Sequence, residues 1–263
     1  MQCTKPFKAK TALVPCGSCL HCRIQRSREW AIRCLHELDS WESAQFVTLT
    51  YDEANLPKEQ TLIVKDLQNF YKKLRKDLDL EGRKIKHFSC GEYGEKYGRP
   101  HYHAIVYGVS PLDKKLLQEN WGKGKIKLGS VNYDSCRYVA DYLLKKVTGK
   151  GELEKYGVRK PPFRIMSNGL GLDYIKRERE RLIENLSFTN RGIRMGLPRY
   201  YRSKLNLDKS CFVPGALEAQ KRADYEWKTD TIKRPWWGLT PKQQANLNLN
   251  AKLSLKVRDF DIA

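Results

Sequence analysis

The 263-residue sequence has no apolar run near the ~20 residues that a membrane-spanning helix needs. It also lacks an apolar stretch at its N-terminus of the kind found in signal peptides, because three lysines already lie between Gln2 and Lys10. We therefore expect a protein that works in the cytoplasm without a membrane partner. In that reducing compartment, its eight cysteines are expected as thiols or metal ligands rather than disulfides.

Three further features are scarce or missing. The sequence has no internal repeat and no phosphate-binding loop of the Walker type, which excludes a repeat array and an ATP-driven motor. Acidic residues number only 30 against 50 basic ones, so the net charge is +20. Because neutralised phosphates release counterions and positive fields steer association, this excess predicts a polyanionic partner. Charge alone indicates nucleic-acid binding and does not indicate catalysis.

The most informative motif is His101-Tyr102-His103, at the head of a β-branched run. Side chains alternate along a strand, so the two histidines share a face, with Cα atoms roughly 7 Å apart. Two imidazoles placed in this way can hold one metal ion. Two polar residues on the wet face of a strand would give the same pattern.

A second motif lies on a predicted helix over residues 135–148, with Asp134 or Ser135 as its N-cap. Its apolar residues gather on one arc of the helix, whereas Tyr138 and Tyr142 lie four residues apart outside that arc. Folding does not require aromatic rings there. The alternative is a pair of surface tyrosines that pack against another element.

Two phenols near a metal ion predict cleavage of a phosphodiester bond. Tyrosine is a weak nucleophile because its pKa is near 10, but a divalent ion on the phosphate stabilises the developing charge. The product would be a phosphotyrosine link to one DNA end and a free hydroxyl on the other. Lys145, beside both tyrosines in the sequence, is expected to position or neutralise the phosphate.

Together, the histidine motif and the tyrosine pair resemble the HUH endonuclease superfamily, and the tyrosine spacing resembles the replication initiators of microviruses. Phe46–Asp52 is similar to the first motif of that superfamily, a hydrophobic strand that ends in threonine. Gly91–Pro100 and Val14–Cys22 resemble the gokushovirus branch. The resemblance covers roughly residues 1–205 in order.

The resemblance implies an α+β fold: a central antiparallel sheet of five strands, related to the RNA-recognition fold and flanked by helices, with the histidines on the central strand. It implies a rolling-circle replication initiator that acts on single-stranded DNA at an origin. One tyrosine keeps the 5′ end while the 3′-hydroxyl primes synthesis, and the second tyrosine later closes the circle. A host helicase and polymerase, in the cytoplasm of a bacterium, would be partners.

In that superfamily, an acid on the preceding strand commonly completes the metal site. We expect Glu92, on the predicted strand Ile85–Tyr93. Glu95 and His87 are the alternatives, because a slip of one residue in register changes which side chain faces the site. Two imidazoles and a carboxylate suit Mg²⁺ or Mn²⁺ as the working ion.

A cysteine cluster precedes this core, with the spacing C-x12-C-x2-C-x2-C at Cys3, Cys16, Cys19 and Cys22. The segment Pro-Cys-Gly-Ser-Cys resembles a zinc knuckle and predicts a structural Zn²⁺ held by these four residues, with His21 as a substitute ligand. Unliganded thiols and an iron–sulfur cluster are the alternatives.

The sequence divides into four predicted parts. Residues 1–42 form a Cys-rich, zinc-binding segment and a helix, and residues 43–150 form the HUH endonuclease core. Residues 151–205 are a basic extension that contacts DNA, and residues 206–263 are a peripheral tail of unknown role. Within these parts we expect helices over 23–41, 65–80, 111–120 and 172–185, strands over 45–50, 85–93, 101–108 and 125–133, and a turn joining two short strands within 187–195.

Five residues are predicted to contact DNA. Arg199-Tyr200-Tyr201-Arg202 interleaves rings with guanidinium groups, which suits a stacked and charged strand. Arg99 directly precedes the histidine motif. A solvated surface patch is the alternative.

Two other functions remain open. A non-enzymatic nucleic-acid-binding protein on a zinc-stapled fold explains the charge and the cysteines but leaves the tyrosine pair unexplained. An HUH transposase or relaxase is the other possibility, although such transposases usually have one tyrosine. Relaxases usually carry a third histidine and a tyrosine near the N-terminus.

Overall fold

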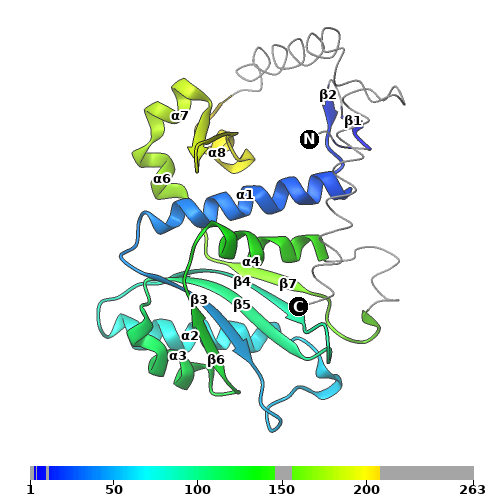
Figure 1. Cartoon of the computed structure of the whole chain (residues 1–263), viewed down its shortest axis with the longest axis vertical. Coiled ribbons are helices and arrows are strands. Elements are labelled where there is room, and N and C mark those ends of the chain that lie inside the picture. The colour runs from blue at the N-terminus through cyan, green and yellow to red at the C-terminus, as the bar shows by residue number, and fades with distance from the viewer. Residues whose placement is uncertain (1–2, 4, 10–11, 146–155, 208–263) are drawn as a thin grey trace, which may run out of the picture.

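Figure 1 shows the computed structural model of the chain, which describes residues 3, 5–9, 12–145 and 156–207. At its centre is a five-stranded sheet in the order β6-β3-β5-β4-β7, and every neighbouring pair is antiparallel. This confirms the predicted α+β class and places the histidine motif on the central strand. The strands are β3 (Ala44–Thr50), β4 (Lys86–Tyr93), β5 (Pro100–Tyr107), β6 (Ile126–Gly129) and β7 (Phe163–Met166).

One face of the sheet is covered by α2 (Val64–Asp79) and α3 (Lys114–Trp121). Short 3₁₀ turns, η1 (Lys58–Gln60) and η2 (Pro111–Asp113), precede these two helices. The predicted apolar stripe of α2 is buried in full, at a spacing that aligns the residues on one side of a helix. It comprises Leu67, Phe70, Tyr71, Leu74 and Leu78.

The opposite face carries α1 (Leu20–Leu38) and α4 (Tyr133–Lys145), which pack against each other and against the sheet. A buried hydrogen bond joins them, in which the Ser27 hydroxyl donates to Asp141 Oδ1 at 2.5 Å. The N-cap of α4 is Asn132 rather than the predicted Asp134 or Ser135. Asn132 Oδ1 accepts from the Ser135 N–H, and Ser135 Oγ accepts from the Asn132 N–H.

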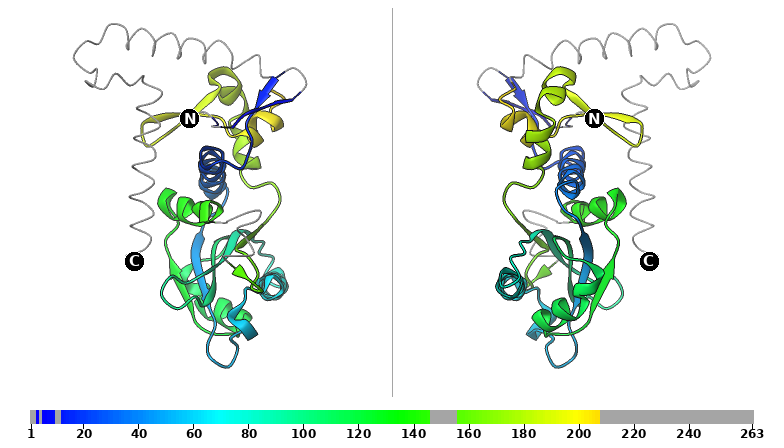
Figure 2. Two further views of the ribbon diagram at one scale, coloured as in Figure 1. Left: turned by 90° about the vertical axis from the view of Figure 1, so that its right-hand side faces the viewer. Right: turned by 90° about the vertical axis from the view of Figure 1, so that its left-hand side faces the viewer.

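A third layer packs on the side of α1 away from the sheet (Figures 1 and 2). Its core gathers apolar residues around Ile32 of α1 and includes Phe188 and Tyr201. The helix predicted over 172–185 is broken at Glu178, whose φ of −97° and ψ of 14° interrupt the helical backbone. The elements are α6 (Leu172–Arg177), α7 (Arg179–Asn185), β8 (Ser187–Asn190), β9 (Ile193–Gly196) and α8 (Arg199–Lys204).

The predicted turn between β8 and β9 is confirmed. Arg191 and Gly192 have φ values of 49° and 75°, the positive pair that a tight two-residue hairpin turn requires. At the N-terminus, β1 (Phe7–Ala9) and β2 (Ala12–Val14) form a second small hairpin, beside the start of α1.

Buried Glu37 joins the three layers. Its carboxylate accepts the Gly171 N–H at 2.7 Å and pairs with Lys86 of β4, also at 2.7 Å. The packing does not follow the predicted division at residues 43 and 151. Helix α1 precedes the predicted core and β7 follows it, yet both pack with the same sheet.

Two predicted features lie outside the described residues: the end of the tyrosine helix and nearly all of the tail at 206–263. Within the described ranges, none of the helices has the length and apolar character needed to cross a membrane.

Candidate metal and nucleophile site

Strand pairing brings Glu92, His101 and His103 to one face of the sheet. Glu92 of β4 lies directly opposite His101 of β5, and Cys90 lies opposite His103. Opposite residues in an antiparallel pair share a face, so the three side chains converge. The alternative ligand His87 points to the other face, where its ring stacks on Tyr71 at 3.7 Å.

The three side chains meet at one carboxylate oxygen. Glu92 Oε1 lies 2.8 Å from His101 Nε2 and 3.1 Å from His103 Nε2. Glu92 and His103 are each only 7% exposed. Burial alone would raise the pKa of Glu92, but the hydrogen bonds and charges of the two histidines lower it overall. Glu92 is therefore held as a carboxylate. The other alternative ligand, Glu95, lies in the turn beyond β4.

The outer nitrogens of both imidazoles are also held. His103 Nδ1 lies 3.0 Å from Thr48 Oγ1, and His101 Nδ1 lies 3.2 Å from the Arg99 carbonyl. A carbonyl only accepts hydrogen bonds, so His101 Nδ1 carries a proton. In the neutral ring, the bare Nε2 then faces a carboxylate oxygen, which requires either a second proton or a cation between them.

The donor set fits a divalent cation. One carboxylate oxygen and two imidazole nitrogens lie within 4.8 Å of one another. The O–N separations of 2.8 and 3.1 Å are close to the spacing, about 3.0 Å, of neighbouring ligands around an octahedral ion with bonds of about 2.1 Å. Three protein ligands leave positions for substrate oxygens and water. The structure thus brings together the three residues that sequence reasoning selected.

Tyr138 lies directly beside this triad. Its ring meets the His103 ring at a centroid distance of 5.2 Å and the Phe46 ring at 5.9 Å, in both cases edge to face. The side chain is 39% exposed, so a substrate has access to it. Tyr142 lies on α4 one turn further along and Lys145 closes that helix, but their side chains lie outside the described part of the structure.

The position of α4 over the triad is fixed from behind by Asp141, between the two tyrosines. Asp141 accepts the Ser27 hydroxyl of α1 at 2.5 Å and pairs with Arg137 at 3.3 Å. Sequence reasoning missed both this contact and Thr48. A signal for Thr48 is present, because Thr48 and Thr50 alternate along β3 and therefore share one face.

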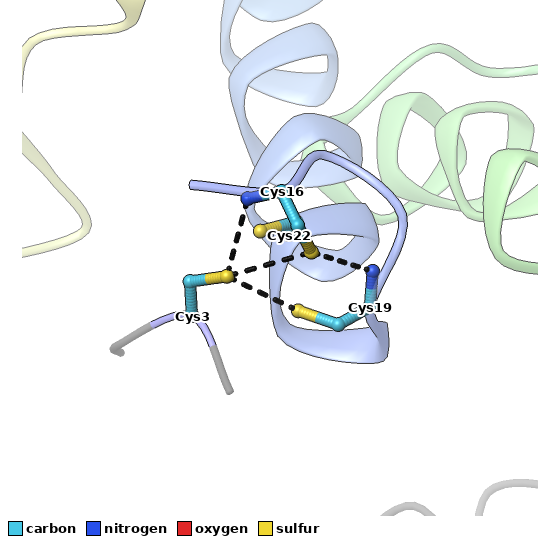
Figure 3. Close-up of side chains that lie close together, drawn as sticks. All are labelled: Cys3, Cys16, Cys19 and Cys22. Atoms are coloured by element: carbon cyan, nitrogen blue, oxygen red, sulfur yellow. Dashed lines mark hydrogen bonds between the residues drawn. The ribbon is translucent and has the colours of Figure 1, made fainter. Parts of the chain in front are cut away.

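The four N-terminal cysteines also converge (Figure 3). The sulfur of Cys3 lies 3.5 Å from that of Cys16 and 3.8 Å from that of Cys19. All four sulfurs lie within 4.8 Å of one another, and none of the described cysteines forms a disulfide. Ligands of a tetrahedral zinc with bonds of about 2.3 Å would lie about 3.8 Å apart. His21, the predicted substitute, is not part of this group.

Backbone donors support thiolates at this cluster. The Cys16 N–H points to the Cys3 sulfur at 3.2 Å, and the Cys19 N–H points to the Cys16 sulfur at 3.3 Å. The second of these bonds lowers the pKa of Cys16. Burial instead raises the pKa of Cys22 to about 12. A bound cation would offset the cost of ionising Cys22, so the cluster is compatible with a metal.

The residues predicted to contact DNA do not form one surface. Tyr201 is fully buried, and its hydroxyl lies 3.0 Å from His36 Nδ1, so the predicted contact of this ring with DNA is wrong. Its position is internal because α8 turns this side into the core of the third layer. Tyr200 lies under the Arg33 guanidinium at 3.8 Å. Arg199 is exposed, and Arg202 lines a hollow of about 350 Å³ between α1 and β9.

Arg99 lies beside the triad. Its guanidinium pairs with Glu53 and donates to the Tyr51 carbonyl at 3.2 Å. It lines a hollow of about 310 Å³ together with His101 and the exposed Tyr97. This prediction therefore places a cation next to the candidate site.

Comparison with known proteins gives one consistent result. Residues 44–147, which span the sheet from β3 to the end of α4, match the family model for replication-associated protein ORF2. Replication-associated protein VP4 of Bdellovibrio phage phiMH2K is 30% identical over 209 residues, covering 72% of this chain and 66% of the relative. Replication-associated protein ORF2 of Spiroplasma virus 4 is 31% identical over 219 residues, covering 73% and 67%.

A third relative, replication-associated protein ORF4 of Chlamydia phage 1, is 30% identical over 214 residues, covering 73% of this chain and 53% of the relative. This chain therefore spans between about half and two thirds of the length of these relatives. No solved structure matches it. The chain belongs to the family of phage replication-associated proteins.

Proposed function

We propose that this protein initiates rolling-circle replication of a small single-stranded DNA phage by cutting and rejoining one DNA strand with tyrosine. The observation that carries the proposal is the contact of the Tyr138 ring with His103, within a buried cluster of one carboxylate and two imidazoles. A nucleophile, a cation site and access from solvent occur at one place. The relatives are named for replication, which agrees with this chemistry.

In the cutting step, the Tyr138 oxygen attacks a backbone phosphorus. A bond forms from the phenol oxygen to phosphorus while the bond from phosphorus to the 3′-oxygen breaks. The proton lost by the phenol is balanced by the proton gained by the 3′-oxygen. A divalent cation such as Mg²⁺ or Mn²⁺, held by Glu92, His101 and His103, would stabilise negative charge on the phosphate oxygens.

One phosphodiester replaces another in this step, so the energy of the broken bond is kept in the phosphotyrosine. Rejoining therefore needs no ATP, which agrees with the lack of a Walker-type loop. Tyr142, one turn further along α4, is the proposed second nucleophile that cuts the regenerated junction after one circuit. Lys145 is the proposed cation that neutralises phosphate beside them.

The remaining assignments are proposals of the same kind. Cys3, Cys16, Cys19 and Cys22 would hold a structural Zn²⁺ that fixes the N-terminal segment to α1. The DNA partner would be a single strand at a phage replication origin, in the cytoplasm of a bacterial host. A host helicase and polymerase would supply strand separation and synthesis.

A covalent adduct tests the proposal. The full-length protein is incubated with circular single-stranded phage DNA and Mn²⁺, denatured in SDS and resolved by electrophoresis. We expect a DNA-linked band that disappears with EDTA and in the double variant Tyr138→Phe/Tyr142→Phe. Tyr133→Phe, at the start of the same helix, is the matched control and should still form the adduct. Tight DNA binding without any adduct would favour the non-enzymatic binding protein instead.

A further inference from the structure

Arg164 lies on the same face of the sheet as the candidate metal site. His103 of β5 is paired with Cys90 of β4, and Cys90 is paired with Arg164 of β7. Paired residues of antiparallel strands share a face, so Arg164 projects on the same side as His103. Two strand spacings separate their backbones, which is roughly 10 Å. Arg164 is therefore a cation beside the triad, at the edge of the sheet.

The surroundings of Arg164 are aromatic and positive. Its guanidinium lies 5.4 Å from the centre of the Trp30 ring on α1. Arg33 lies against the same ring at 4.0 Å. Burial lowers the pKa of Arg164, and the positive charges of Arg26 and Arg33 lower it further. Three guanidinium groups thus raise one another's energy beside Trp30.

No carboxylate within the described ranges pairs with Arg164 or Arg26. Arg26 donates to the Gly17 carbonyl at 3.4 Å, a weak contact. Glu29 of α1 acts instead on Arg33, whose pKa it raises, and accepts a hydrogen bond from Gln25 at 3.2 Å. Partly desolvated cations without counter-charges are costly, and an anion that settles between them offsets this cost.

Arg33 is already committed to the protein. Its Nε donates to the Leu170 carbonyl at 3.1 Å, and its plane lies against Tyr200 at 3.8 Å. Arg33 therefore contributes charge while it holds the third layer. The forks of Arg164 and Arg26 are the ones available to an anion, since Arg164 is half-buried and Arg26 exposed.

We propose that Arg164 and Arg26 form a phosphate-binding subsite that holds the DNA strand next to the phosphate at the triad. The strand would run from the triad across β4 and β7 toward the first half of α1. This inference rests on the proposed function for the identity of the strand. Its chemistry, recognition of a phosphodiester by two guanidinium groups, stands on the arrangement of the arginines.

The salt dependence of binding tests the subsite without the cutting step. Binding of the full-length protein to a fluorescent thymidine oligonucleotide is measured by anisotropy, in EDTA, from 0.05 to 0.5 M NaCl. Each phosphate contact on a single strand contributes a slope of about 0.7 in log affinity against log salt. We expect Arg164→Gln to lower the slope by about 0.7 and the affinity at 0.1 M salt about fivefold. Arg164→Lys should keep the slope.

Arg75→Gln is the matched control. Arg75 also lies over an aromatic ring, that of Tyr71 at 5.8 Å, but on α2 at the opposite face of the sheet. It should leave both slope and affinity unchanged. Arg26→Gln, at an exposed position, is a second variant that does not endanger folding and should also lower the slope.

The outcomes separate the two proposals. An unchanged slope in both Arg164→Gln and Arg26→Gln would overturn the subsite, even if the protein forms covalent adducts. A lowered slope in both variants, in a protein that never forms an adduct, would support the subsite and contradict the cutting reaction.

Discussion

The ring of Tyr138 meets the ring of His103 edge to face, with centroids 5.2 Å apart and an angle of 82° between their planes. This contact joins α4 to the central strand at the point where Glu92 and His101 converge with His103. The hydroxyl-bearing ring therefore lies at the candidate cation site through the packing of the fold, before any substrate binds.

The first prediction concerns the two nucleophiles. Tyr138→Phe removes one oxygen but keeps the ring that packs on His103 and Phe46, so the melting temperature should stay unchanged. Each of Tyr138→Phe and Tyr142→Phe should still cut single-stranded DNA once, because the other hydroxyl remains. Circle closure should fail in both, since it needs both tyrosines. Adducts formed by the double variant would place the nucleophile elsewhere.

The second prediction concerns the candidate metal ligands. His103→Ala should abolish metal-dependent cutting while leaving salt-sensitive DNA binding nearly intact, because most binding energy comes from basic residues elsewhere. The two readouts are adduct formation and anisotropy on the same sample. If binding were lost along with cutting, His103 would have a structural role.

The third prediction concerns Thr48, whose hydroxyl holds His103 Nδ1 at 3.0 Å. Partners of metal-ligating histidines typically contribute about 10–100-fold to metal affinity, so Thr48→Val should weaken Mn²⁺ binding by that factor. Isothermal titration calorimetry measures it. Thr50→Val, two residues along β3, is the control, because its hydroxyl donates to the Lys125 carbonyl instead. Equal affinities in both variants would contradict the role of Thr48.

The fourth prediction concerns pH. Burial lowers the pKa of His87 to about 3, whereas in the unfolded chain it is about 6.5. The unfolded state therefore binds more protons below pH 6.5, and stability falls as the pH drops from there toward 3. One such group contributes a slope of about 1.4 kcal/mol per pH unit. His87→Phe, which keeps the stack on Tyr71, should lower the slope of unfolding free energy between pH 6 and 4 by about that amount.

Chemical denaturation at several pH values measures this slope. His36 provides an internal comparison, because burial also lowers its pKa to about 3 and its contribution should remain in the His87 variant. A slope equal to that of the wild type would show that His87 titrates normally in the fold.

The local parts of the site could be predicted from the sequence. Alternation along a strand places His101 and His103 on one face, and helical spacing places Tyr138 away from Val139 and Ala140. Glu92 is the expected third ligand, and the register of β4 on β5 brings it opposite His101. These features follow from repeats of two or about four residues that the sequence displays directly.

Long-range packing could not be predicted in the same way. Strand β7 has four residues after a proline pair, too few to show alternation, so the sequence places it in an extension. Tyr201 lies in a polar, basic segment, yet α8 turns it into the core against His36. The link from Ser27 to Asp141 spans 114 residues, and no local pattern marks it.

Mapping the residue that carries the DNA tests the central claim most directly. Trypsin cuts after Arg137 and Lys145, so Tyr138 and Tyr142 fall on one peptide. The adduct is digested with nuclease and trypsin, and the modified peptide is sequenced by mass spectrometry. We predict a nucleotide joined through its 5′-phosphate to Tyr138 or Tyr142. A phosphonucleotide on any other residue would contradict the account.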